Sequence, residues 1–174
     1  WVRDSDQALR INSEGANTSY HPELKLSDNI VASDNLNEVL INASVIFIAT
    51  PSIIFEQIVE RISEFIDSDS FIISCTKGVL DNPFRSLSEI IDLKLKNKIG
   101  VLSGPNLAKE IAENKLAGTV IASSDEDLLN LVKSILSSKH FKIYSSKDMQ
   151  GVELAGALKN IYAIICGLAE SLDV

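Results

Sequence analysis

A lysine and an asparagine stand in the middle of an apolar segment near the end of the chain. Lys159 and Asn160 close the segment 151–160, and the apolar run continues to Leu168. A helix that is apolar on every side is normally buried. The positions three and four away from Lys159 hold no carboxylate that could pair with it on its own helix. Because a buried, unpaired charge is costly, we expect Lys159 to line a site and to meet a ligand.

A second lysine follows a short apolar run. Lys77 lies in Cys75-Thr76-Lys77-Gly78, directly after the candidate strand 71–75. In open α/β sheets, ligands bind outside the carboxyl ends of the strands, so Lys77 could aim its ammonium into such a crevice. A solvated loop lysine is an equally good interpretation.

The segment 49–52 follows another candidate strand. Pro51 would end that strand and Ser52 could cap the next helix, and a plain turn fits the segment as well.

A third candidate segment runs from Ser103 to Glu110. Gly104 permits close approach of the backbone, Pro105 suits the first turn of a helix, and free N–H groups there suit an anion such as phosphate. Asn106 offers both a donor and an acceptor. A simple helix start with Asn106 as its cap is the alternative. Together with Lys77 and Lys159, the segment predicts a site for a small anionic substrate, in which a lysine with a lowered pKa acts as acid or base.

Alternating strand and helix patterns must position these residues. Near-continuous apolar runs predict strands at 45–49, 71–75 and 99–102, with further candidates at 30–32, 119–122 and 141–144. Amphipathic stretches lie between them, one of them introduced by Asp125 as a plausible N-cap. This alternation predicts an α/β fold with a parallel sheet. No strand pattern follows residue 147, so we expect a domain boundary there, with residues 1–146 forming an α/β domain and 147–174 beginning a helical one.

Composition excludes several classes of function. The chain has 174 residues and a net charge of −8, which argues against nucleic acid or an anionic membrane surface as a partner. We expect no apolar run to reach the length of a membrane span. Cys75 and Cys166 lie in apolar surroundings and are expected to be buried, reduced thiols of a cytoplasmic protein. The two histidines and two cysteines have no metal-ligand spacing, so no metal site is predicted.

The two ends of the chain suggest part of a longer protein. The first residues, beginning at Trp1, read as the tail of a strand and have no signal-peptide character. The last residues stop inside a helical pattern.

Four motifs resemble those of one enzyme family. Trp1-x-Arg3-Asp4, Thr76-Lys77-Gly78, the segment 103–110 and Gly151-Val152-Glu153-Leu154-x-Gly156-Ala157-Leu158-Lys159-Asn160 look like the motifs of NAD(P)-dependent sn-glycerol-3-phosphate dehydrogenase of the bacterial and organellar type. The resemblance implies a Rossmann-like, doubly wound, mostly parallel sheet followed by the start of an all-α domain. Residues 1–146 would be a partial NAD(P)-binding domain, and 147–174 the start of the helical substrate and catalytic domain.

The resemblance also assigns an activity. The parent protein would interconvert sn-glycerol 3-phosphate and dihydroxyacetone phosphate and supply phospholipid synthesis. Independently of the resemblance, a buried helical domain leads us to expect a homodimer. Lys159 would be the general acid/base, and Lys77 would touch both substrate and cofactor and polarise the reacting oxygen. Gly104 and Asn106 would hold the substrate, and Asn160 would support it beside Lys159.

The cofactor residues follow from the same resemblance. Ala108 would lie against the cofactor, and Arg3 would meet the adenosine ribose or its 2′-phosphate, so that NADP is accepted as well as NAD. Bacterial members usually have Thr or Ser where this chain has Asn106, whereas the eukaryotic cytosolic branch has Asn. The Gly-rich phosphate turn expected before Trp1 and most of the helical domain are absent, so this chain alone is expected to bind cofactor poorly and to catalyse little.

Two other functions stay open from the sequence. One is another dehydrogenase of the same two-domain architecture that acts on a hydroxy acid or sugar acid, although the segment 103–110 argues against it. The other is a non-catalytic nucleotide-binding or assembly module, in which Lys159 is a structural residue at a helical interface.

Overall fold

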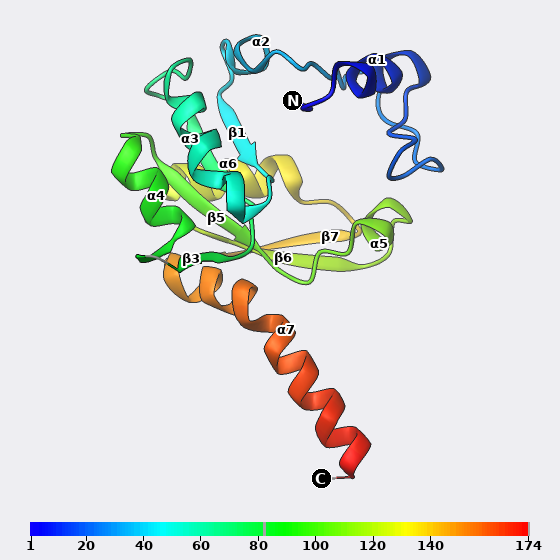
Figure 1. The fold of residues 1–174 in the computed structure, drawn as a ribbon, viewed down its shortest axis with the longest axis vertical. Helices are drawn as coiled ribbons and strands as arrows, with labels where there is room; N and C mark the ends of the chain where they lie inside the picture. Colours follow the sequence, from blue (N-terminus) through cyan, green and yellow to red (C-terminus); the bar gives the residue numbers. More distant parts are fainter. Residues whose placement is uncertain (82, 174) are drawn as a thin grey trace.

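A five-stranded sheet forms the centre of the protein in a computed structural model that describes residues 1–81 and 83–173 (Figure 1). The strand order is β1-β2-β5-β6-β7, with bounds β1 Val45–Ile48, β2 Phe71–Ser74, β5 Ile99–Ser103, β6 Ala117–Ala122 and β7 Phe141–Ser146. All neighbouring pairs are parallel except β5 and β6, which are antiparallel. The predicted mostly parallel α/β sheet is confirmed, and the antiparallel pair is a feature that the alternating pattern does not reveal.

Helices cover both faces of this sheet, because its central strands are apolar on both sides. On β2, Ile72 packs in one core with helices α3 (Phe55–Ser63) and α4 (Leu87–Lys94). Its neighbour Ile73 packs in a second core with α6 (Glu126–Leu136). Successive side chains of a strand point to opposite faces, so β2 contributes to both cores. Asp125 accepts a hydrogen bond from the Leu128 N–H at 2.9 Å, which confirms it as the N-cap of α6.

The segment before the sheet departs from the predicted pattern. It contains α1 (Ser5–Glu14) and α2 (Leu36–Leu40), but the strands expected at 30–32 and at Trp1 are wrong. The side-chain amide of Asn12 pairs with both backbone groups of Ala32, accepting from its N–H and donating to its carbonyl oxygen at 2.8 Å each. This amide bonds backbone groups that a neighbouring strand would otherwise pair, and the side chains of Ile30 and Val31 are exposed.

Two connections between strands also differ from the predicted pattern. Ser52 does not cap a helix, because Ser52–Ile54 forms a 3-10 turn, η1, and α3 begins at Phe55 without a side-chain cap. A short antiparallel hairpin, β3 (Val79–Asp81) and β4 (Phe84–Ser86), lies between Lys77 and α4. It was not predicted, since its strands are only three residues long.

The last helix, α7 (Met149–Leu172), extends away from the sheet (Figure 1). Its first turns contact β5 and α4. From Leu158 to Leu172 every residue except Ala169 is exposed, because no described element lies against that half. The expectation that the whole apolar run is buried is therefore wrong for this chain. The domain boundary at residue 147 stays a prediction.

Candidate functional site

The loops that follow β2 and β5 meet at one edge of the sheet. These strands are parallel neighbours, so their carboxyl ends lie side by side. The ammonium of Lys77, three residues beyond β2, donates a hydrogen bond to the Gly104 carbonyl oxygen, directly after β5, at 2.9 Å. Two segments that are 27 residues apart in sequence are thereby joined at the place where the sequence predicts a site.

The loop that contains Gly104 and Asn106 is pressed against β6. A Cβ added to Gly104 would lie 2.9 Å from Thr119 Cα, closer than real side chains approach, so only glycine fits there. The Asn106 side-chain nitrogen donates to the Thr119 hydroxyl at 3.0 Å, and its backbone N–H donates to the Gly104 carbonyl at 2.8 Å. The Asn106 carbonyl oxygen Oδ1 is buried and has no partner among the described residues, so it is an acceptor available to a ligand.

This loop is not a helix start, which corrects a prediction. Helix α5 is Ala108–Ala112, and Leu107 occupies its N-cap without a side-chain bond. Pro105 therefore precedes the helix instead of opening it, and Asn106 does not cap it. The anion site expected from free N–H groups of a helix at Pro105 has no support in the structure.

Helix α7 approaches this loop closely at Gly156. A Cβ added to Gly156 would collide with Ser103 Oγ and would lie 3.9 Å from Lys77 Cγ. The absence of a side chain therefore allows α7 to lie against the end of β5. One turn further along α7, Lys159 lies near the same loop.

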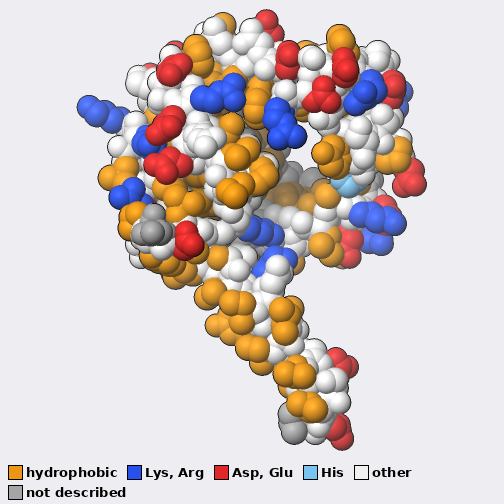
Figure 2. Space-filling view, in the orientation of Figure 1, with side chains coloured by type: hydrophobic (Ala, Val, Ile, Leu, Met, Phe, Trp, Pro, Cys, Tyr) orange, Lys and Arg blue, Asp and Glu red, His pale blue; other side chains and the backbone are white. Residues whose placement is uncertain are grey.

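A pocket of about 460 Å³ lies between α7 and the loop. Among the described residues that line it, Lys159 supplies the only charged side chain, and small residues of α7 leave room for a ligand. Figure 2 shows basic side chains gathered where α7 leaves the body of the protein, beside a hollow in the surface. The described residues that line the pocket are Ser103, Gly104, Pro105, Asn106, Leu107, Val120, Val152, Ala155, Gly156 and Lys159.

The two lysines influence each other electrostatically. Partial burial lowers the pKa of Lys77, and the positive charge of Lys159 lowers it further. Lys159 itself is exposed, so the expectation that it is a buried charge is wrong. Two cations that repel each other beside an apolar pocket favour the binding of an anion, because its charge relieves the repulsion. A lysine with a lowered pKa is also better suited to proton transfer near neutral pH.

The remaining predicted residues lie outside this pocket. Arg3 is exposed and directly precedes Asp4, the N-cap of α1. Ala108 is the exposed first residue of α5, and Asn160 is exposed on α7 beside Lys159. The structure thus places Gly104, Asn106 and Lys159 around one pocket and ties Lys77 to it through the Gly104 carbonyl oxygen. It does not bring Arg3, Ala108 or Asn160 to this pocket.

Two residues near the site, Thr119 and Glu153, were missed from the sequence. Thr119 is buried within β6, beside the end of β5, and no sequence motif marks it. Glu153 is the only described residue of α7 that is classed as buried. A sequence signal for Glu153 exists, since a carboxylate in an apolar helix needs partners.

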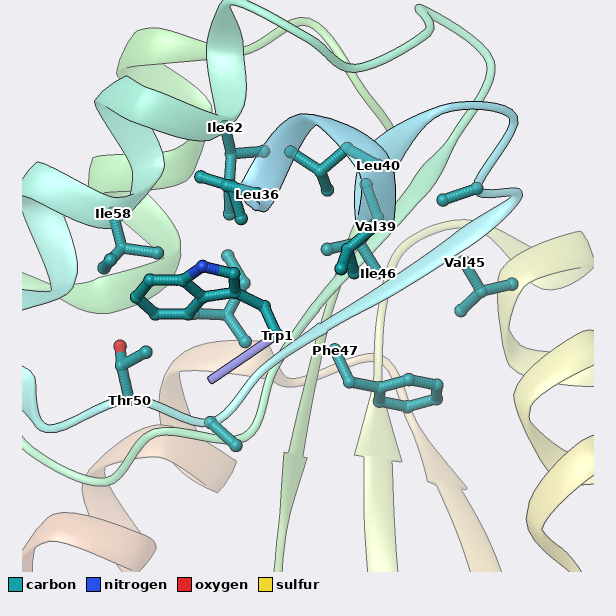
Figure 3. Close-up of a pocket in the computed structure, with 13 residues that line it drawn as sticks. Trp1, Leu36, Val39, Leu40, Val45, Ile46, Phe47, Thr50, Ile58 and Ile62 are labelled. Carbon is teal, nitrogen blue, oxygen red and sulfur yellow. The ribbon is translucent and has the colours of Figure 1, made fainter. Parts of the chain in front are cut away.

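A second hollow, of about 250 Å³, follows the open edge of β1. Figure 3 shows the Trp1 indole lying across it, between β1 and the side chains of α3 and α2. The indole N–H donates to the Asp34 carbonyl at 2.9 Å, and the Arg61 guanidinium lies 5.3 Å from the ring centroid. None of the described residues that line this hollow is charged, and its walls offer mainly apolar contact.

Metal and thiol chemistry have no support among residues 1–81 and 83–173. No group of three or more His, Cys, Asp or Glu side chains that could hold a metal is found there. Cys75 is half-buried, and its burial raises the pKa of the thiol to about 12. Cys166 is exposed on α7, so the expectation that both thiols are buried is wrong for Cys166.

Helix α7 is long and apolar enough to cross a membrane when length and composition alone are considered, with a mean hydropathy of 1.4 in its most apolar window. This contradicts the expectation that no apolar run reaches that length. The same measures fit the core helix of a soluble protein, so they are weak evidence for a membrane span.

Comparison with known proteins identifies the family of this chain. The family model of the N-terminus of NAD-dependent glycerol-3-phosphate dehydrogenase matches residues 1–129, and the model of its C-terminus matches residues 148–174. A relative from Alcanivorax borkumensis, named glycerol-3-phosphate dehydrogenase [NAD(P)+], is 45% identical over the whole of this chain and 51% of its own length.

Solved structures resemble the fold throughout. The glycerol-3-phosphate dehydrogenase of Coxiella burnetii has a TM-score of 0.90 and 32% identity, over 99% of this chain and 53% of its own. That of Plasmodium falciparum has a TM-score of 0.92 and 31% identity, over 100% of this chain and 50% of its own. The chain spans about half the length of the relatives it matches. On these matches, the chain belongs to the NAD-dependent glycerol-3-phosphate dehydrogenase family.

Proposed function

We propose that the whole protein to which this chain belongs is an NAD(P)-dependent oxidoreductase that interconverts sn-glycerol 3-phosphate and dihydroxyacetone phosphate. One observation carries the proposal: Lys159, Gly104 and Asn106 line a single pocket, and the Lys77 ammonium bonds to the Gly104 carbonyl oxygen. The names of the relatives support the same activity.

The substrate fits the chemistry of this pocket. Its phosphate is an anion, and the two lysines supply positive charge. Its hydroxyl or carbonyl oxygen can bond to groups such as the unpartnered Asn106 Oδ1 or a lysine ammonium. Apolar walls from Leu107, Val120 and Val152 exclude water around the reacting carbon and strengthen the electrostatic contacts inside.

We assign Lys159 as the general acid/base. In the direction of carbonyl reduction, its ammonium gives a proton to the C2 oxygen of dihydroxyacetone phosphate, and in the reverse direction the neutral amine accepts that proton from the C2 hydroxyl. Lys77, held by the Gly104 carbonyl, polarises the same oxygen. Gly104 and Asn106 orient the substrate, and Asn160 supports it beside Lys159.

The nicotinamide cofactor, when bound, supplies or accepts the hydride at C2. The chain offers a dinucleotide-type sheet whose carboxyl edge carries these groups, and the unpartnered Asn106 Oδ1 and the close approach at Gly104 fit a ligand there. We assign Arg3 to the adenosine ribose or its 2′-phosphate and Ala108 to the wall of the cofactor site. NADP and NAD are both proposed as cofactors.

The larger organisation of the protein is part of the proposal. The last strand ends at Ser146 and α7 begins at Met149, which supports a division near residue 147 into a nucleotide-binding domain and a helical domain. The exposed apolar side chains of α7 support the presence of further helices that cover them. We further propose a cytoplasmic homodimer that supplies glycerol 3-phosphate to phospholipid synthesis.

The experiment is a turnover assay on the full-length protein. Oxidation of NADPH and of NADH with dihydroxyacetone phosphate is followed for the wild type, for Lys159→Met and for Lys133→Met, a matched control on the exposed face of α6. Rapid oxidation that only Lys159→Met abolishes supports the activity and the role of Lys159. A folded wild type that oxidises neither cofactor refutes the proposed reaction.

A further inference from the structure

The buried carboxylate of Glu153 ties α7 to the N-terminus of α4. Glu153 Oε1 accepts a hydrogen bond from the backbone N–H of Ser88 at 2.9 Å, and Oε2 accepts one from the Ser88 hydroxyl. The side chain of Glu153 is 4% exposed. Among the ion pairs of the described residues, none includes Glu153. Its charge is therefore met by Ser88 and by the positive end of the α4 dipole.

The N-terminus of α4 is already well capped without Glu153. Ser86 and Glu89 form a capping box, in which the Ser86 hydroxyl accepts from the Glu89 N–H and Glu89 accepts from the Ser86 N–H. The Ser88 N–H is a further donor of the first turn that has no partner inside the helix. Glu153, 65 positions away in sequence, accepts the hydrogen bond from this N–H. Because α4 already has its own cap, this contact serves mainly to hold α7 in place.

Three positions of α7 at intervals of three residues make successive contacts around the helix. Each step of three residues turns about 60° short of a full rotation and advances about 4.5 Å. Glu153 faces α4, Gly156 meets Ser103 on β5, and Lys159 reaches the pocket. A rotation of α7 about its axis would move all three together. The contacts at Glu153 and Gly156 therefore determine where the Lys159 side chain points.

We propose that Glu153 is a positioning residue, which holds α7 through Ser88 so that Lys159 is correctly placed beside Gly104 and Lys77. The inference rests on the proposed function in assigning the acid/base role to Lys159. The anchoring of α7 can be tested without that role.

The kinetic test uses the full-length protein with Glu153→Gln, Glu153→Asp and Ser88→Ala, and with Glu170→Gln as a matched control on the exposed face of the same helix. Glu153→Asp is one methylene shorter and can reach the Ser88 N–H only if α7 shifts. A misplacement of about 1 Å costs on the order of a hundredfold in rate. We expect kcat to fall between about tenfold and about a hundredfold, with cofactor affinity nearly unchanged and the thermal midpoint of unfolding lowered, because the buried contacts of Ser88 are disturbed.

A double-mutant cycle separates positioning from general stability. If Glu153 acts through Ser88, then Ser88→Ala lowers kcat in the wild type and has no further effect in the Glu153→Gln background. Full additivity of the two substitutions would overturn the proposal. A kcat that stays within about twofold of wild type in Glu153→Asp, with only a lower unfolding temperature, would also overturn it.

A second readout does not require activity. The pH dependence of acylation at Lys77 is measured by mass spectrometry in the same full-length variants. If Glu153→Gln releases α7, Lys159 moves away from Lys77 and the acylation curve of Lys77 shifts to higher pH, whereas Glu170→Gln leaves it in place. Absence of turnover in the wild type would refute the proposed reaction alone. An unshifted Lys77 curve in both Glu153→Gln and Glu153→Asp would refute the anchoring of α7.

Discussion

The Lys77 ammonium and the Gly104 carbonyl oxygen are joined by a hydrogen bond of 2.9 Å across the ends of two parallel strands. This bond fixes the only lysine of the β2 loop in the direction of α7, where Lys159 supplies the second positive charge. The Gly104 carbonyl accepts most strongly when Lys77 is a charged ammonium, and the positive charge of Lys159 disfavours that charged form. The Lys77–Gly104 pair is therefore sensitive to charge at Lys159.

We predict that Lys159→Met raises the pKa of Lys77. Burial and the positive charge of Lys159 both lower this pKa, and the substitution removes the second cause only. The pKa of Lys77 should therefore rise but stay below the ordinary value for lysine. Competitive acylation of this chain as a function of pH, read at Lys77 by mass spectrometry, should shift to higher pH. Lys133→Met serves as the control, and an equal shift there would contradict the electrostatic explanation.

Much of the fold could be predicted from the sequence, because its signals are local. The apolar runs at 45–49, 71–75 and 99–102 coincide with strands to within one residue at each end, since strands covered on both faces need apolar side chains throughout. Asp125 acts as the N-cap because its carboxylate lies three residues before the N–H that it accepts from.

The missed features depend on contacts that are distant in sequence. The antiparallel direction of β6 is set by its pairing with β5, and residues 30–32 lie against Asn12 instead of a strand. At the site, Lys77, Gly104, Asn106 and Lys159 were singled out by type and position. Thr119 and Glu153 were missed, because their importance comes from partners 13 and 65 residues away. The burial expected of α7 was wrong because no described element lies against its second half.

Thr119 should control substrate affinity through Asn106. Its buried hydroxyl accepts the hydrogen bond that orients the Asn106 amide, so Thr119→Val leaves an amide donor without its acceptor. A loss of about 1–2 kcal/mol corresponds to a roughly five- to thirtyfold increase in the KM for dihydroxyacetone phosphate in the full-length protein. Thr119→Ser keeps the hydroxyl and should retain most of the affinity. Equal KM values for the Val and Ser variants would show that the hydroxyl has no such role.

Asp125 should contribute a pH-dependent part of the stability. Its pKa is lowered by a hydrogen bond from Lys98 and by the Leu128 N–H that it caps. A carboxyl group with a lowered pKa in the folded state stabilises the fold fully above its unfolded pKa, and this contribution is lost as pH falls through the folded pKa.

Asp125→Asn tests this contribution, because asparagine is an equally good N-cap but has no charge to titrate. The wild type should exceed Asp125→Asn in the free energy of unfolding by about 1 kcal/mol or less at neutral pH, as expected for an exposed ion pair. The difference should vanish below the folded pKa. Urea unfolding of both chains from neutral to acid pH checks it, and a constant difference at every pH would exclude titration of Asp125 as the cause.

Gly156→Ala should displace α7 from β5 and lower kcat, and a second substitution at Ser103 should restore kcat. The added methyl group collides with Ser103 Oγ, and such overpacking costs about 1–3 kcal/mol, against a gain of about 1 kcal/mol in helix propensity. In the full-length protein we expect kcat to fall by at least tenfold, since Lys159 is displaced with the helix.

The structure offers both a control and a rescue for this variant. Gly167, on the same helix, has nothing within 4 Å of an added Cβ in this chain, so Gly167→Ala should stabilise this chain by about 1 kcal/mol and gives the gain in helix propensity without a collision. The new methyl at 156 would lie 3.5 Å from Ser103 Cβ, an ordinary contact, so adding Ser103→Ala removes the collision and should restore kcat. If the double variant stays as slow as Gly156→Ala, the collision with the hydroxyl is not what displaces Lys159, and the close approach of α7 to β5 must have another cause.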